Sequence, residues 1–329
     1  MPSLSPAIAE IRLAVRTALA DLPEGSTVIV ALSGGADSLA LAAATAFEAS
    51  RLGLTVASVT IDHGLQEASA EVAARAADSA KGLGLDALVV RVDVDGAGGP
   101  EAAAREARYR VLRDAAADAG ASAVLLGHTL DDQAETVLLG LARGSGAASL
   151  QGMSPAREDE EGTRWLRPLL GVRRETTRAF CAASDLQPWE DPHNQDARFA
   201  RVRARNSVLP VLEAELGPGI AEALARTAEQ LREDTEAFDE MIHETIEDIV
   251  EHAEAGISVS VAALAANPAA LRNRIIRLVV DSEFGVSLTR TQTVEVARLV
   301  TDWSGQGPID LPGCSAVRRG GQLVFAARD

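Results

Sequence analysis

The first half of the chain alternates short apolar runs with longer, alanine-rich segments of helical periodicity. Five apolar runs predict strands, at Thr27–Leu32, Leu54–Ile61, Ala87–Val92, Ala123–Gly127 and Trp165–Leu170. The segments that predict helices are Leu39–Arg51, Ser69–Leu83, Glu101–Ala119, Asp131–Arg143 and Arg174–Ser184. Such alternation is typical of a parallel sheet covered by helices on both faces. We therefore predict an α/β fold with a doubly wound, mostly parallel sheet, in which ligands bind at the carboxyl ends of the strands.

The pattern changes near Asn206–Pro210. From there, Leu216–His252 has apolar residues three, four or seven positions apart, which predicts one long helix with an acidic outer side. Further helices are predicted at Asn267–Asp281 and Arg290–Thr301, before a short β-like end at Pro308–Ala327. We therefore divide the chain into a first domain, 1–210, and a second, mainly helical domain, 211–329.

The charge of the chain is unevenly spread. The 329 residues carry a formal net charge of −17, the wrong sign for a general nucleic-acid binder. Residues 164–205 nevertheless hold nine arginines against five acids, a local charge of +4, whereas residues 211–256 hold fourteen acids against two arginines, a local charge of −12. The arginine-rich stretch is available for phosphates, and its alternative interpretation is a solvated surface.

The two cysteines, Cys181 and Cys314, lie far apart and form no C-x-x-C pair. This usage is typical of a reducing compartment and argues against a zinc or iron–sulfur site. The opening segment, residues 2–22, has the pattern of an amphipathic helix rather than of a signal peptide, and no apolar run is long enough for a membrane span. We therefore expect a cytoplasmic protein that does not bind a membrane.

A loop rich in serine and glycine follows the first predicted strand. It consists of Ser33, Gly34, Gly35, Ala36, Asp37 and Ser38. Glycines let the backbone turn sharply, so that the amides at the start of the next helix can face a phosphate chain. The serine hydroxyls add donors, and the carboxylate of Asp37 can hold magnesium against the same phosphates. The alternative is an ordinary turn between a strand and a helix.

Two further polar clusters follow predicted strands. Asp62 and His63 come after the second strand, and His128 comes after the fourth. Asp132 and Glu135 lie three residues apart and so share a face of the next helix. Carboxylates in this position can bind a cation or an amine, and an imidazole can contact phosphate or assist proton transfer. Helix capping explains one carboxylate, but not the three acids Asp131, Asp132 and Glu135 beside a histidine.

Taken in order, these motifs resemble those of the tRNA(Ile)-lysidine synthetase family, which belongs to the PP-loop ATP pyrophosphatase superfamily. The resemblance rests on SGGADS, DHGL, GHTLDDQAET, Arg143–Gly146, Gly152-Met153, Arg167–Leu170, Glu190–Asn194, Arg201–Arg205 and Leu209-Pro210. It runs from about Val28 to Pro210. It implies an adenine nucleotide alpha-hydrolase-like PP-loop domain that binds ATP and carries catalysis, followed by a helical domain that helps to hold tRNA.

The resemblance also implies a reaction. The amine of free lysine replaces the carbonyl oxygen at position two of the wobble cytidine in a tRNA(Ile) with a CAU anticodon. ATP first adenylates that oxygen and pyrophosphate leaves; the amine then attacks the activated carbon and AMP departs. Such a ligase requires ATP as co-substrate, Mg2+, free lysine and the tRNA, and we allow for a homodimer.

Residue roles follow from the same resemblance. Residues Ser33 to Ser38 would hold the pyrophosphate end of ATP, and Asp62 and His63 would lie at the adenosine–phosphate edge, unless they only form a turn. Asp37 and Asp132 are the candidate magnesium ligands, and whether Asp132 and Glu135 bind metal or the lysine amine stays open. The full set of candidate catalytic residues is Asp37, His128, Asp132, Glu135 and Arg108.

Basic residues complete the predicted site. Either Arg105 or Arg108 would stabilise the phosphoryl transition state, with a solvated helix face as the alternative. Arg201, Arg203 and Arg205 would contact tRNA phosphates, since the guanidinium fork suits phosphate oxygens. The chain departs from the family pattern at Gln66, where arginine is usual, and at Val202, where asparagine is expected.

Other functions fit the sequence less well. Sulfur-inserting tRNA enzymes need cysteines near the strand ends, and neither cysteine here lies in one of the motifs. A PP-loop synthetase that adenylates or amidates a small molecule fits the loop and the acidic charge, but not the later motifs. A non-catalytic nucleotide-binding scaffold would have no reason to keep Asp37, Asp132 and Glu135 together.

Overall fold

The computed structural model describes residues 5–64, 68–92, 100–144, 146–253 and 256–328. Contacts divide the chain into two compact units, 1–232 and 233–329. The division falls within helix α10 (Ile220–Ile249). The domain boundary at residue 210 stays a prediction. In the described part of the chain, no helix is both long and apolar enough to cross a bilayer.

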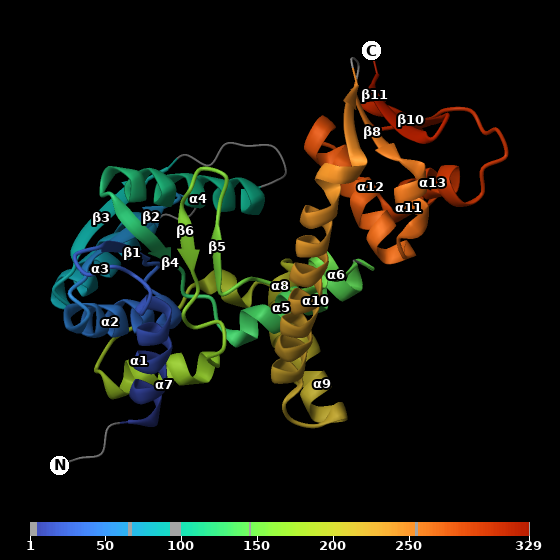
Figure 1. Ribbon diagram of the computed structural model, residues 1–329. Helices are drawn as coiled ribbons and strands as arrows, with labels where there is room; N and C mark the ends of the chain where they lie inside the picture. The colour runs from blue at the N-terminus through green and yellow to red at the C-terminus, as the bar shows by residue number, and fades with distance from the viewer. Residues whose placement is uncertain (1–4, 65–67, 93–99, 145, 254–255, 329) are drawn as a thin grey trace. The chain divides into compact units, whose positions relative to one another are not determined.

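The first unit is built on a six-stranded sheet in the order β3-β2-β1-β4-β6-β5 (Figure 1). Its strands are β1 (Thr27–Ala31), β2 (Thr55–Asp62), β3 (Asp86–Arg91), β4 (Ala121–Leu125), β5 (Ala156–Glu158) and β6 (Arg164–Leu166). All neighbouring strands pair in parallel except β5, which runs antiparallel to β6. The predicted mostly parallel sheet is therefore confirmed. The expected strand Trp165–Leu170 ends early, at Leu166, because Pro168 cannot donate to a strand ladder.

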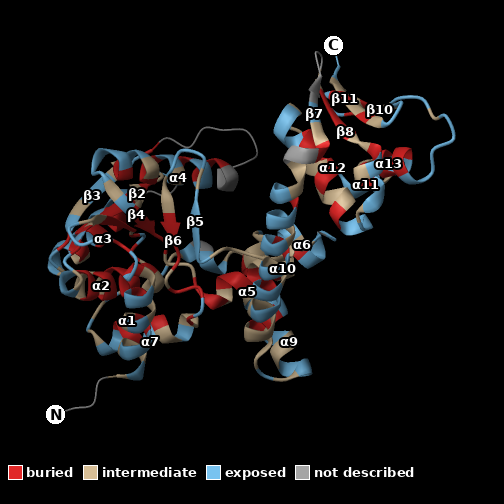
Figure 2. Cartoon of the chain, in the orientation of Figure 1, coloured by how far each residue is buried: buried red, intermediate tan, exposed pale blue. Residues whose placement is uncertain are grey.

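Helices cover both faces of this sheet. The helices whose side chains join the cores on its two faces are α1 (Pro6–Leu19), α2 (Ala36–Arg51), α3 (Ser69–Gly82), α4 (Pro100–Asp118) and α7 (Arg174–Ala183). Helices α5 (Leu130–Ala142) and α6 (Ala147–Leu150) follow β4 and pack on each other instead. Successive side chains of β1 point to opposite faces: Val28 and Val30 join the core with α1, α2, α3 and α7, and Ile29 joins the core with α4. The central strands are thus buried on both sides, as Figure 2 shows in red.

The chain leaves the sheet through short helical segments. These are η1 (Pro192–Gln195), α8 (Ala200–Arg203), the single π-helical turn η2 (Ala204–Val208) and α9 (Leu209–Leu216). Leu130 and Ala134 of α5 pack with Leu209 and Ala221 in a small apolar cluster. This packing places the arginines of α8 and η2 beside α5.

The second unit combines helices with an antiparallel sheet in the order β7-β8-β11-β10-β9. Its elements after α10 are β7 (Val250–Ala253), β8 (Gly256–Ser260), α11 (Val261–Ala266), α12 (Ala269–Phe284), α13 (Arg290–Thr301), β9 (Ile309–Leu311), β10 (Cys314–Arg319) and β11 (Gln322–Ala327). The expected helices and β-like end are present. The long helix was expected to reach His252 but ends at Ile249, and β7 then pairs with β8. The β-branched residues of Gly256–Ser260 favour that hairpin.

Candidate active site

Three helices begin at the carboxyl ends of neighbouring strands. Helix α2 follows β1, α5 follows β4 and α7 follows β6, and these three strands are adjacent in the sheet. Gly127 brings two of the helices together, because a Cβ there would lie 3.3 Å from the backbone of Asp37 and Ser38. The clusters predicted after the first and fourth strands therefore do meet at one edge of the sheet.

The loop Ser33–Ser38 is held in shape by its own serines. The hydroxyl of Ser38 donates to the carbonyl of Gly35 at 3.0 Å and accepts from the amide of Ser33 at 3.2 Å, while the two serine hydroxyls lie 3.1 Å apart. Gly34 has φ +84°, a conformation that other residues rarely adopt. Helix α2 then starts at Ala36, so its first amides lie next to the loop, where an anion is favoured.

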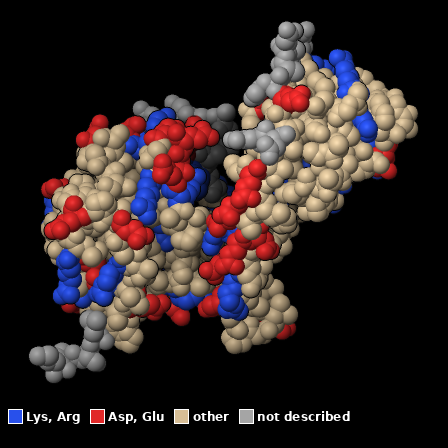
Figure 3. All heavy atoms as spheres, in the orientation of Figure 1, with Lys and Arg blue, Asp and Glu red and all other residues tan. Residues whose placement is uncertain are grey.

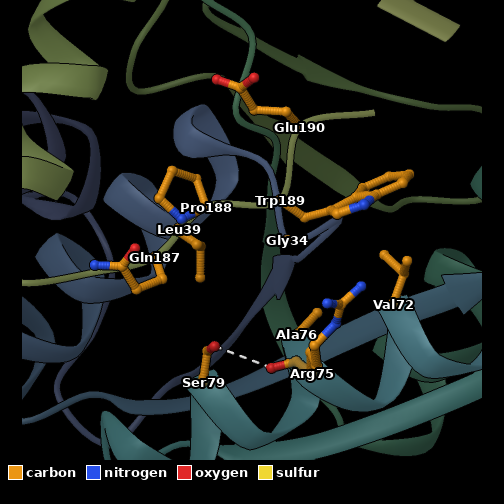
Figure 4. Close-up of a pocket in the computed structure, with 10 residues that line it drawn as sticks. All are labelled: Gly34, Leu39, Val72, Arg75, Ala76, Ser79, Gln187, Pro188, Trp189 and Glu190. Atoms are coloured by element: carbon orange, nitrogen blue, oxygen red, sulfur yellow. Dashed lines mark hydrogen bonds between the residues drawn. The ribbon is translucent and has the colours of Figure 1, made fainter. Parts of the chain in front are cut away.

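A cavity of about 260 Å³ lies on one flank of this loop (Figure 4). Val72, Arg75 and Ala76 of α3 form one side of it, and Pro188 and Trp189 lie opposite. The amide of Trp189 donates to the carbonyl of Gly34 at 2.9 Å. The segment that follows α7 therefore contacts the loop through its backbone.

Asp37 is held by two residues of α7. Its carboxylate accepts a hydrogen bond from the hydroxyl of Thr177 and lies 3.6 Å from Nε of Arg174. Burial raises the pKa of Asp37, and the charge of Asp132 adds to that rise, although Thr177 and Arg174 oppose it. Occupation of the site by a cation would favour the ionised form of this carboxylate.

Asp132 and Glu135 form ion pairs with two arginines. Asp132 accepts from Arg174 at 2.8 Å and from Arg205 at 3.2 Å. Glu135, which is 0 % exposed, accepts from Arg205 at 2.7 and 3.0 Å and from Arg174 at 3.2 Å. We call Asp37, Asp132, Glu135, Arg174 and Arg205 the carboxylate–arginine cluster.

Asp132 also takes part in capping helix α5. Its other oxygen accepts from the amide and hydroxyl of Thr129, at 2.8 and 2.9 Å, in a capping box at the start of α5. Burial by itself would raise the pKa of Asp132, but the charge of Arg174 and the amide of Thr129 outweigh it and the pKa is lowered. Asp132 is therefore ionised at neutral pH.

His128 is half-buried beside this cluster. Burial lowers its pKa to about 4, against the attraction of Asp132, and the positive charges of Arg167, Arg105 and Arg201 lower it further. The imidazole is therefore neutral at pH 7, and its Nδ1 has no hydrogen-bond partner within the described residues. A neutral imidazole can donate or accept one hydrogen bond, but it brings no charge to a phosphate.

The cluster after β2 lies near α4. Asp62 accepts from the amide of Gly64 at 3.0 Å, and hydrogen bonds from Ser69 and Gly64 hold its pKa below the usual range. Burial, followed by the positive charge of Arg108, lowers the pKa of His63. Asp62 therefore shapes the turn. Leu65 and Gln66, which follow Gly64 in the sequence, lie outside the described residues.

The other candidate arginines have different surroundings. Arg105 donates to the hydroxyl of Tyr109 at 3.3 Å, and Arg108 is exposed. Arg201 donates to Thr136 at 3.0 Å and lies 3.8 Å from Glu135. Arg203 instead donates to the backbone carbonyls of residues 197 and 198, both at 2.8 Å. Of the three arginines predicted to contact tRNA, Arg203 is thus the one without a carboxylate partner in the described part of the chain.

The donor set suits a cation that is also bound by phosphates. Magnesium usually takes one or two carboxylates and fills its other positions with phosphate oxygens and water. Asp37 and Asp132 supply such carboxylates, while the described residues contain no group of three or more His, Cys, Asp or Glu side chains that could by themselves hold a metal ion. The site therefore fits magnesium that arrives with a nucleotide better than a resident metal.

Two residues of the site were missed by the sequence analysis. Arg174 and Thr177 lie on the first turn of α7, the helix that follows strand β6. The rule that singled out His128, namely that ligands bind where parallel strands end, applies equally to this helix start. The segment Gly171–Thr177 therefore carried a usable signal.

Comparisons with known proteins cover nearly the whole chain. A family model described as "PP-loop domain" matches residues 9–212, and one described as "TilS substrate binding domain" matches residues 260–324. The chain is 60 % identical over 306 residues to the tRNA(Ile)-lysidine synthase of Leifsonia xyli subsp. xyli, covering 92 % of this chain and 91 % of that protein. It is 52 % identical to the tRNA(Ile)-lysidine synthase of Salinispora tropica, covering 98 % of both proteins.

Among solved structures, the U34-tRNA thiolase NcsA from Methanococcus maripaludis, with its [4Fe-4S] cluster, has a similar fold. The TM-score is 0.60 at 19 % identity, covering 69 % of this chain and 79 % of that one. At this identity the likeness extends to the fold alone.

Proposed function

The chain belongs to the tRNA(Ile)-lysidine synthase family, and we propose that it joins free lysine to the wobble cytidine of tRNA(Ile) at the carboxylate–arginine cluster. The supporting observation is the position of Asp132 and Glu135. Both lie on α5, and Arg174 connects them to Asp37 beside the loop Ser33–Ser38. An ATP-binding loop and a pair of carboxylates suited to an amine therefore share one edge of the sheet.

Adenylation of the tRNA would use the first part of this site. The amides and hydroxyls of Ser33–Ser38 would bind the pyrophosphate end of ATP, at the N-terminus of α2. Asp37 and Asp132 would hold magnesium, which, when bound, offsets the charge that develops on the departing pyrophosphate. Arg105 or Arg108 of α4 would contribute further positive charge from the side of His63 and His128.

Lysine transfer would use the second part. Asp132, which would serve magnesium in the first step, would in the second step bind the side-chain amine together with Glu135. One of these carboxylates, or a water molecule, would accept the proton that the amine must lose before attack. His128, neutral at pH 7, would donate a hydrogen bond to the activated phosphate or accept one. In the structure both carboxylates form ion pairs with Arg174 and Arg205, so an amine that binds there must displace at least one of these two arginines.

The substrates suggest a reaction assay. Purified protein would be incubated with ATP, magnesium, radiolabelled lysine and a CAU-anticodon tRNA(Ile) transcript, and label retained covalently on the RNA would be counted. We expect incorporation that depends on ATP. Pyrophosphate release with a small molecule, without any label on the tRNA, would contradict the proposal and favour a small-molecule synthetase.

Arg203 offers a test of tRNA binding. The Arg203→Glu variant is expected to weaken tRNA binding and to reduce the slope of log affinity against log salt by about 1, because a phosphate contact releases counterions. ATP affinity should not change. Figure 3 shows acidic side chains along α10, and these repel phosphates. Binding of tRNA therefore depends on local contacts between arginine and phosphate rather than on the net charge of the protein. Filter binding across a salt series measures both quantities.

A control variant separates the local contact from net charge. Arg51 is exposed at the far end of α2, stacked over the ring of Phe47 at 4.5 Å. Arg51→Glu makes the same change in net charge and should leave tRNA binding close to wild type. Equal weakening by the two variants would show that only long-range charge matters, and would remove Arg203 from the tRNA contact.

A further inference from the structure

Arg174 contacts all three carboxylates of the carboxylate–arginine cluster. Its Nη2 lies 2.8 Å from Asp132, its Nη1 lies 3.2 Å from Glu135 and its Nε lies 3.6 Å from Asp37. The side chain is 14 % exposed. Arg205, in comparison, contacts Asp132 and Glu135 only. Among the ion pairs of the described residues, Arg174 is thus the cation that pairs both with Asp37, in the loop Ser33–Ser38, and with the two carboxylates of α5.

The backbone around Arg174 is fixed against α5. The amide of Arg174 donates to the carboxylate of Asp131 at 2.8 Å, and the amide of Leu130 donates to the carbonyl of Val172 at 2.9 Å. The starts of α5 and α7 therefore hold each other in place. A guanidinium mounted on this junction has a defined position relative to both helices, because its planar fork also fixes the direction of each hydrogen bond.

Thr177 extends this arrangement to Asp37. Its hydroxyl donates to the carboxylate of Asp37 and lies 2.8 Å from the carbonyl of Arg174. Asp37 thus has a second anchor on α7, independent of the long contact with Arg174. Among the described residues, Glu135 has no other connection to α7, and Asp132 is also held by Thr129 on its own helix, so the loss of Arg174 should affect Glu135 most.

We propose that Arg174 is a positioning residue for the second step of the reaction. It sets the place of Glu135 relative to Asp37, and hence the separation between the lysine amine and the adenylated base. This inference rests on the proposed function. Geometry matters here because a displacement of about 1 Å between reacting groups can cost about 100-fold in rate.

The test measures the two steps separately. Single-turnover release of pyrophosphate without lysine reports adenylation, and addition of lysine to pre-adenylated tRNA reports transfer. For Arg174→Gln we expect transfer to slow by about 100-fold and adenylation by less than about 5-fold. The KM for lysine should stay the same or fall while kcat falls, because the variant removes a cation that competes with the amine.

Two further variants make the result specific. Arg174→Lys keeps the charge but loses the fork, so transfer should remain slow; full recovery with lysine would show that charge alone is needed, and would overturn the positioning role. Arg173→Gln removes the neighbouring arginine, which pairs with Asp131 and Glu222 instead, and should keep both steps near wild type.

The outcomes separate this inference from the proposed function. A wild-type protein that forms no lysidine would contradict the proposed function itself. An active wild type, with Arg174→Gln equally slow in both steps or unchanged in both, would leave the proposed function standing and overturn the role of Arg174.

Discussion

The Asp37→Ala variant is expected to lose lysine incorporation by about 100- to 1,000-fold, the range seen when a group that stabilises transition-state charge is removed. Asp37 lies in the first turn of α2, next to the loop that would bind the pyrophosphate. Of the carboxylates in the carboxylate–arginine cluster, it is the one that belongs to the loop Ser33–Ser38 itself. Without it, the charge of departing pyrophosphate would lose the cation that Asp37 is proposed to hold.

The measurement is label retained on tRNA(Ile) in the presence of ATP, magnesium and radiolabelled lysine. Asp37→Asn serves as a second variant, because it keeps the size of the side chain and an acceptor for Thr177 while removing the charge. Asp86→Ala, at an exposed carboxylate at the start of β3, is the matched control and should remain active. Activity of Asp37→Asn within a few-fold of wild type would show that this charge is not needed.

The Glu135→Ala variant should lose both stability and lysine transfer. Glu135 is 0 % exposed, and its removal leaves Arg174 and Arg205 without one of their shared partners. Breaking a buried ion pair from one side costs roughly 3–5 kcal/mol. We expect the lower end, since Arg205 is 24 % exposed and can turn toward solvent.

Urea unfolding measures this loss, and the transfer assay measures activity on the fraction that remains folded. Glu135→Gln keeps the shape and one acceptor oxygen, so it should be more stable than the alanine variant yet still slow in transfer. The control is Glu10→Ala on α1, where the carboxylate is exposed. Unfolding free energies that agree for Glu135→Ala and Glu10→Ala would contradict the buried ion-pair network.

The sequence predicted the framework because that information is local. Alternation of apolar runs and helical segments located β1 to β4. The polar residues after β1, β2 and β4 were expected to converge at one edge of the sheet, and those after β1 and β4 lie together there. The long helix was extended wrongly to His252, because periodicity alone does not distinguish the end of an amphipathic helix from a following β-strand.

The partners of the charged side chains could not be predicted in the same way. Arg174 is 42 residues from Asp132, and Arg205 is 70 residues from Glu135. A pattern of arginines shows that cations are present but not which anion they meet. Arg205 was therefore assigned to tRNA phosphate, and in the structure it lies on carboxylates of α5; its role toward tRNA stays a prediction.

The pairing of Arg205 with Asp132 and Glu135 has a thermodynamic consequence. A cationic amine that binds these carboxylates competes with Arg205, and a phosphate that binds Arg205 competes with the carboxylates. Each ligand thereby removes an obstacle to the other. Binding of either ligand therefore raises the affinity of the protein for the other, and the factor is the same whichever ligand binds first. The order in which the two substrates arrive would then follow from their concentrations, and a ternary complex would be favoured over either binary complex.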